Sequence, residues 1–217
     1  MPIDSAAVAR LIEAGQAPPP AWIDDITELR LERSYITDLR PVAALTALRR
    51  LVLTRSRVSA IAPLAPLIHL RSLHLSFTAV NDVTPLAGMT MLEGCFLTGT
   101  LVEDITPLAG LTRLERLDLG GTRISDVTPV AGLQNLRTLD LSGTAVSDVA
   151  PLAGLVRLQY LDLTHTRVTD LSPLASLSDL RRVDLRGTQV KDLSALAGMP
   201  ECQIVTTVLV ARRRQLR

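Results

Sequence analysis

The sequence predicts an α/β repeat solenoid, an arc with a concave parallel β-sheet and with 3-10 or short helical turns on the convex side. Three observations predict this fold. One leucine pattern returns at a fixed 22-residue step, leucines alternate with other residues at the centre of each unit, and proline and glycine mark each return leg. Units that repeat in this way stack on one another and bury one continuous core.

Residues 1–25 are predicted to form an N-terminal helical cap, because an open stack would expose its core. Asp4 or Ser5 can cap a short amphipathic helix that Gly15 ends. The apolar face of this helix consists of Val8, Leu11 and Ile12. The stretch APPPAW then leads into the first strand.

Residues 26–199 are predicted to contain eight repeats of 22 residues without an insertion. The units begin at Ile26, Leu48, Leu70, Leu92, Leu114, Leu136, Leu158 and Leu180. Side chains alternate along a strand, so Leu139 and Leu141 are expected to point inward and Asp140 outward. The return leg reads DVTPLAGL or a variant of it. Aspartate caps, proline suits a first turn and glycine ends one, which predicts a 3-10 or very short helical turn.

The unit reads approximately L-x-x-L-x-L-x-x-[ST]-x-[VI]-x-D-[VIL]-x-P-[LV]-A-x-[LM]. This pattern resembles the leucine-rich repeat and, within it, the short bacterial type of the internalins. The resemblance covers Ile26 to Met199. It implies a right-handed arc and recognition of another protein's surface.

One column departs from the family pattern, because many leucine-rich repeats have asparagine at the turn after the strand. Here a hydroxyl takes that place in every unit, and we expect it to satisfy a buried backbone group of the neighbouring turn. This hydroxyl column consists of Ser34, Ser56, Thr78, Thr100, Thr122, Thr144, Thr166 and Thr188.

Residues 200–217 are predicted to form a C-terminal cap strand and a basic tail. CQIVTTVLV reads as a last, partly irregular strand, and ARRRQLR follows it. Charge at a sheet edge discourages another chain from adding a strand, so we interpret the tail as protective or disordered. Contact with phosphate or an acidic partner is the alternative for Arg212, Arg213, Arg214 and Arg217.

The chain has 47% hydrophobic residues, as a globular protein does, and a net charge of +1. A net charge this small gives no overall bias toward nucleic acid or membrane. The N-terminal stretch does not read as a secretory signal, so a cytoplasmic location is expected. Secretion as an effector without a visible signal is the alternative. Cys95 and Cys202 stand where other repeats carry leucine, so we expect core residues and not a disulfide pair or metal ligands.

No residue pattern predicts an enzyme, a cofactor or a metal site. GGTR at Gly120 lacks the spacing of a phosphate-binding loop. His74 and His165 are the only histidines placed on the concave face, and four strand spacings separate them by roughly 19 Å. That distance excludes a shared metal site. No serine or cysteine has a histidine placed as a catalytic triad requires.

Four carboxylates form one outward column in the second half of the sheet. This aspartate row consists of Asp118, Asp140, Asp162 and Asp184. Neighbouring carboxylates about 5 Å apart repel one another, and Arg116, Arg182 and Arg186 stand close enough in sequence to neutralise part of the row. We interpret the row as a solvated feature of the repeat or as a docking surface for a basic or hydrogen-bond-donating partner. A flat ladder supplies few oxygens for calcium, which leaves metal binding or catalysis as the third alternative.

The same column changes character in the first half. There it reads Arg30, Val52, His74 and Phe96. Nearby outward and rim positions add Arg33, Tyr35, Arg50, Arg55, Arg57, Phe77 and Leu101. Arginine, tyrosine and exposed phenylalanine are typical interface anchors, so this half predicts a partner-binding surface, with scattered surface variation as the alternative.

The sequence therefore predicts a noncatalytic protein-interaction module, a scaffold or regulator that binds another protein on its concave face. The expected partner surface is acidic and apolar, and the chain is taken as a monomer by default. A secreted bacterial effector or adhesin-type binder of host proteins is the first alternative. A binding domain of a larger enzyme is the second.

Overall fold

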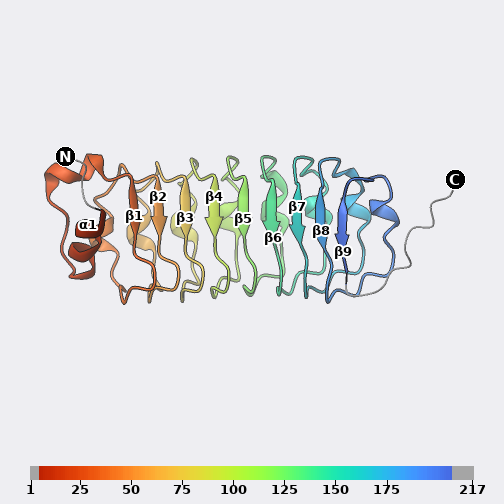
Figure 1. The fold of residues 1–217 in the computed structure, drawn as a ribbon, viewed down its shortest axis with the longest axis horizontal. Helices are drawn as coiled ribbons and strands as arrows, with labels where there is room; N and C mark the ends of the chain where they lie inside the picture. Colours follow the sequence, from red (N-terminus) through yellow and green to blue (C-terminus); the bar gives the residue numbers. More distant parts are fainter. Residues whose placement is uncertain (1–4, 207–217) are drawn as a thin grey trace.

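The computed structural model describes residues 5–206, which form one stacked sheet with a helix at its N-terminal end (Figure 1). Nine parallel strands pair in chain order. They are β1 (Glu28–Arg30), β2 (Arg50–Val52), β3 (Ser72–His74), β4 (Gly94–Phe96), β5 (Arg116–Asp118), β6 (Thr138–Asp140), β7 (Tyr160–Asp162), β8 (Arg182–Asp184) and β9 (Gln203–Val205). The predicted solenoid of leucine-rich repeat architecture is confirmed.

The register of the sheet follows the 22-residue step through β8. Leu51 pairs with Leu29 on one side and Leu73 on the other, and the same offset continues to Val183. β9 departs from it, because Ile204 pairs with Val183 at an offset of 21. The ninth strand therefore extends the sheet beyond the eight predicted repeats.

The core is one continuous leucine-rich layer beneath the strands. Leu139 and Leu141 are both buried, as the alternation predicted. Cys95 fills a leucine position completely, and burial raises the pKa of its thiol to about 12, which keeps it protonated and unreactive. Cys202 is only partly buried at the end of the stack.

Short 3-10 helices, one in each unit, form the side of the solenoid opposite the sheet, and a further one lies in the N-terminal segment before β1. They are η1 (Pro20–Asp25), η2 (Arg40–Val42), η3 (Ala62–Leu64), η4 (Thr84–Leu86), η5 (Thr106–Leu108), η6 (Thr128–Gly132), η7 (Ala150–Leu152), η8 (Ser172–Ser176) and η9 (Ser194–Leu196). The repeated aspartate helps to start these turns. In η4, Asp82 Oδ1 accepts a hydrogen bond from the Thr84 N–H at 2.8 Å. In five further units an aspartate accepts the backbone N–H of the residue two positions later in the same way. These are Asp104, Asp126, Asp148, Asp170 and Asp192.

The hydroxyl column is structural, but its bonds differ from the prediction. Thr78 Oγ1 donates to the carbonyl of Leu75 at 2.6 Å, inside its own unit and not to the neighbouring turn. The same bond forms at Ser34, Thr100, Thr122, Thr144, Thr166 and Thr188. Ser56 Oγ is buried without a hydrogen-bond partner among the described residues.

Helix α1 (Ser5–Glu13) packs against β1 at the N-terminal end of the sheet. It buries Val8 and Ile12, whereas Leu11 is half-buried. Gly15 follows the helix with φ of 75°, the left-handed conformation expected where a glycine ends a helix. Asp4 and the predicted basic tail lie outside the described residues, and the predicted domain boundaries stay predictions.

No helix within residues 5–206 is long and apolar enough to cross a membrane.

Candidate protein-binding face

The face of the sheet turned away from the core is the concave face of the predicted arc. The last residue of each strand from β1 to β8 lies on this face, and the register joins these residues in one row across the sheet. The row reads Arg30, Val52, His74, Phe96, Asp118, Asp140, Asp162 and Asp184. The structure therefore brings the predicted arginine and aromatic residues and the aspartate row onto a single surface.

An aromatic pair lies at the centre of the first half. The rings of His74 and Phe96 stack with centroids 4.3 Å apart and an interplanar angle of 12°. The Phe96 ring lies against Gly94, where an added Cβ would approach it to 3.0 Å. The Arg116 guanidinium lies 5.9 Å from the Phe96 centroid, so it contacts this ring and forms no ion pair with the aspartate row among the described residues.

The surroundings of the His74 imidazole favour its neutral form. Burial lowers its pKa, and the positive charges of Arg50 and Arg116 lower it further. Its Nε2 lies 3.0 Å from the Ser72 hydroxyl, which fixes the plane of the ring against Phe96.

Immediately after the strands, one column of residues has a left-handed backbone. This turn column contains glycine in four units, with φ of 64°, 65°, 65° and 73° at Gly99, Gly121, Gly143 and Gly187. The other four units place side chains there, with φ of 55°, 60°, 59° and 57° at Arg33, Arg55, Phe77 and His165. A residue with a Cβ loses about 1–2 kcal/mol in this conformation. The strain at these positions was not predicted, although the four glycines at one position of the repeat are a signal of it.

The four strained side chains are exposed, and two of them, Arg55 and Phe77, contact each other. Phe77 is 51% exposed, and the Arg55 guanidinium lies 5.1 Å from its centroid. On the rim, Tyr35 is 77% exposed beneath Arg57, which lies 4.5 Å from the ring centroid. Leu101 is also exposed. These aromatic residues face solvent, as the sequence predicted.

A hollow of about 530 Å³ lies beside them over β1 to β3. We call it the arginine hollow, and it is lined by Glu32, Arg33, Arg50, Val52, Thr54, Arg55, His74 and Phe77. The prediction that Val52 is an accessible contact residue is wrong. It is only 3% exposed, because it lies on the floor of the hollow between Arg30 and His74 of the neighbouring strands.

Charges in the arginine hollow are only partly paired. Glu28 Oε1 lies 2.7 Å from Arg30 Nε and 3.5 Å from Arg50 Nε, and Arg30 also approaches Glu32. Such exposed pairs contribute little to stability. Within residues 5–206, no carboxylate lies within ion-pair distance of Arg33 or Arg55. The two strained arginines therefore keep their charge unpaired.

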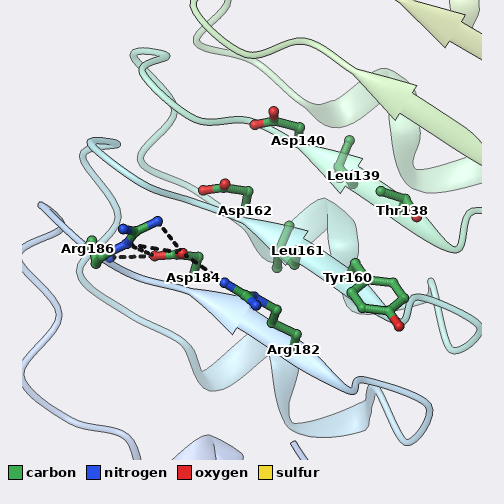
Figure 2. Close-up of a pocket in the computed structure, with 9 residues that line it drawn as sticks. All are labelled: Thr138, Leu139, Asp140, Tyr160, Leu161, Asp162, Arg182, Asp184 and Arg186. Atoms are coloured by element: carbon green, nitrogen blue, oxygen red, sulfur yellow. Dashed lines mark hydrogen bonds and ion pairs between the residues drawn. The ribbon is translucent and has the colours of Figure 1, made fainter. Parts of the chain in front are cut away.

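The aspartate row ends in an ion pair whose carboxylate is buried, which corrects the prediction for its last member (Figure 2). Asp184 is only 4% exposed, so it is neither solvated nor available for docking. Arg186 covers it with bonds of 2.9 Å from Nε to Oδ1 and 2.8 Å from Nη2 to Oδ2, and Arg182 lies 3.8 Å away. Burial raises the pKa of Asp184, but the hydrogen bonds from Arg186 outweigh it and leave the pKa lowered.

The other three aspartates close the ends of their strands. Each carboxylate accepts the backbone N–H two residues on, at 3.2 Å for Asp118, 2.7 Å for Asp140 and 2.8 Å for Asp162. Burial raises the pKa of Asp140, and the charges of its two neighbours in the row raise it further. Figure 2 shows Asp140 and Asp162 along a hollow of about 280 Å³ that Tyr160 and Asp184 also line. Tyr160 was not among the predicted site residues.

Among residues 5–206, no group of three or more histidine, cysteine, aspartate or glutamate side chains is placed to hold a metal ion.

Comparisons with known proteins agree with this architecture. Residues 112–154, 134–176 and 156–198 match the family model described as leucine-rich repeats in two copies. Fold and surface thus define a leucine-rich repeat protein. Internalin C2 of Listeria monocytogenes is 30% identical, with a TM-score of 0.83 over 95% of this chain and 94% of that chain. The chain belongs to the internalin-like leucine-rich repeat proteins, which confirms the resemblance read from the repeat.

Two further solved structures share the fold. The internalin InlF of Listeria monocytogenes is 23% identical, with a TM-score of 0.74 over 92% of this chain and 67% of that chain. The plant peptide hormone receptor RGFR1, solved in complex with RGF2, is 16% identical, with a TM-score of 0.73 over 83% of this chain and 32% of that chain. No curated protein matches the sequence.

Proposed function

We propose that this chain is a noncatalytic scaffold or regulator that binds a protein partner on the first half of its concave face. Membership in the leucine-rich repeat proteins supports an interaction module. The observation that carries the location is the turn column. Arg33, Arg55 and Phe77 occupy consecutive units in a left-handed conformation where Gly99, Gly121 and Gly143 follow in the next three.

Glycine at these positions would remove the conformational strain, so these side chains do not serve the folding of the turn. Backbone strain of this kind concentrates at functional sites. Phe77 leaves half of its surface in water, and a partner that covers it recovers about 25 cal/mol per Å². The three side chains therefore contribute more to binding than to the free energy of folding.

Contacts among the exposed side chains prepare this surface for a partner. Arg55 lies against Phe77, Arg57 against Tyr35, and His74 is stacked on Phe96. A side chain that is already ordered loses less conformational entropy on binding than a free one. The arginines favour an acidic partner surface, and the rings favour an apolar one.

The test begins with capture of a partner by the intact chain and its identification by mass spectrometry. We expect Arg55→Gly and Phe77→Gly each to weaken binding of that partner at least tenfold, about 1.4 kcal/mol. Glycine fits the left-handed backbone at both positions, so neither variant is expected to lower the melting temperature by more than about 2 °C.

His165→Gly is the matched control, because it makes the same backbone change in the second half of the face. It is expected to leave partner affinity unchanged. Equal affinity in all three variants, or an equal loss in His165→Gly, contradicts binding on the first half and favours the aspartate half or the convex surface.

A further inference from the structure

The arginine hollow carries an excess of positive charge that the rest of the chain does not share. Three arginines, Arg33, Arg50 and Arg55, and one glutamate, Glu32, line it, and Arg30 and Glu28 form an ion pair beside it. Two positive charges therefore have no counterion there, whereas the whole chain has a net charge of only +1. His74 adds no charge, since burial and the charge of Arg50 lower its pKa.

The two unpaired charges belong to Arg33 and Arg55, which occupy equivalent turns of adjacent units. The Arg33 N–H donates to the Thr54 carbonyl at 2.9 Å, and the Arg55 N–H donates to Ser76 in the same way. Neighbouring turns of the stack are about 4.8 Å apart, so the two like charges repel each other. Phe77 takes the next turn of the same column. The resulting order along the column is cation, cation, exposed ring.

Arginine is well suited to bind an anion at such a position. Its guanidinium presents several donors in one plane and binds a carboxylate through two parallel hydrogen bonds. An anion between Arg33 and Arg55 removes their mutual repulsion and uses donors that now face water. Apolar surface at Phe77, which is half-exposed, lies next to these donors. A ligand that pairs both arginines and covers the exposed ring has two negative groups followed by one apolar group.

We propose that the arginine hollow binds an acidic segment of the partner protein, in which two carboxylate side chains and one apolar side chain follow at alternate positions. In an extended chain such side chains share one face about 6.6 Å apart, a spacing that long arginine side chains can reach. The first carboxylate contacts Arg33, the second contacts Arg55, and the apolar side chain covers Phe77, in the order of the column. This assignment rests on the proposed function, because it specifies the partner chemistry of the same face.

The test uses the intact protein and short fluorescent peptides, with binding followed by anisotropy at low and high salt. In the main probe, two glutamates and then one phenylalanine stand at alternate positions, with serine at the positions between them. A second probe has glutamine for both glutamates, and a third has phosphoserine for both. We expect the glutamate peptide to bind, the glutamine peptide to bind at least about tenfold more weakly, and added salt to weaken the former.

Variants then locate the binding. Arg33→Gly and Arg55→Gly are each expected to weaken binding of the glutamate peptide at least about fivefold. Arg55→Lys is expected to lose less affinity than Arg55→Gly, because lysine keeps the positive charge. Glycine fits the backbone at both sites, so these variants remain folded. Arg113→Gln is the control, because it removes an exposed arginine from the turn before β5, at the opposite ends of the strands from the turn column. It is expected to leave the affinity unchanged.

Three outcomes overturn the proposal. The glutamine peptide binds as tightly as the glutamate peptide, Arg113→Gln loses as much affinity as Arg33→Gly and Arg55→Gly, or the phosphoserine peptide binds at least about tenfold more tightly than the glutamate peptide. The last result assigns the hollow to phosphoryl groups. If no peptide binds but Arg55→Gly and Phe77→Gly still impair capture of the natural partner, this inference fails and the proposed function stands.

Discussion

The left-handed turn column provides a quantitative test of the repeat geometry, with Gly143→Ala as the main perturbation. Gly143 has φ of 65°, where a Cβ costs about 1–2 kcal/mol. Alanine recovers about 0.4–1 kcal/mol by restricting the unfolded chain. The added Cβ would lie 3.7 Å from Gly121 Cα, an ordinary contact, so no clash adds to the cost. The free energy of unfolding is expected to fall by about 0.5–1 kcal/mol.

Two companion substitutions give the opposite sign. Gly88 lies outside the left-handed column and has no atom within 4 Å of an added Cβ, so Gly88→Ala is expected to gain about 0.4–1 kcal/mol. Arg33→Gly removes a Cβ from the strained conformation and breaks no ion pair described here, so it is expected to gain about 0.5–1 kcal/mol.

Urea denaturation followed by circular dichroism measures all three variants against the unsubstituted chain. For a chain of this size, 1 kcal/mol corresponds to a shift of about 2–4 °C in melting temperature. Two results would contradict a conformational cost: equal changes in stability for Gly143→Ala and Gly88→Ala, or a loss of stability in Arg33→Gly. Either result would show that the turn column has no conformational cost.

Three further expectations concern the core and the aspartate row. Leu141→Ala, in the middle of the stack, is expected to cost about 2–5 kcal/mol in chemical denaturation, and a loss below about 0.5 kcal/mol would mean that this leucine is not buried. Asp140→Asn with Asp162→Asn is expected to leave stability unchanged or slightly higher at neutral pH. Because the pKa of Asp140 is raised, any gain in stability disappears as the pH falls through that pKa. Calorimetry would contradict a solvated row if it detected micromolar calcium binding to the unsubstituted chain that the double substitution abolishes. Asp184→Asn is expected to cost about 1–3 kcal/mol, since it leaves Arg186 without its buried partner. The lowered pKa of Asp184 means that this contribution is present above the ordinary value of about 3.9 and is lost as the pH falls through the folded-state pKa, so the two melting curves should converge in acid.

The fold was predictable nearly in full, because a strict period constrains every unit at once. Leu139 and Cys95 lie where the repeat places them, and the eight predicted strands follow the same step. The site was less predictable, because the period gives the direction of a side chain and not its exposure. Val52 and Asp184 both point away from the core, yet neighbouring side chains cover them.

The hydroxyl column has a consequence for the evolution of length in this protein. Thr122 and Thr144 each bond a carbonyl of their own unit, so neither depends on the identity of the unit beside it. Gain or loss of one whole repeat therefore leaves these bonds intact and changes the span of the sheet by about 4.8 Å. The ends behave differently, since α1 and β9 each contact one particular terminal strand. Duplication and deletion should accordingly be tolerated between the caps, where a lineage can lengthen or shorten its recognition surface without redesigning any turn.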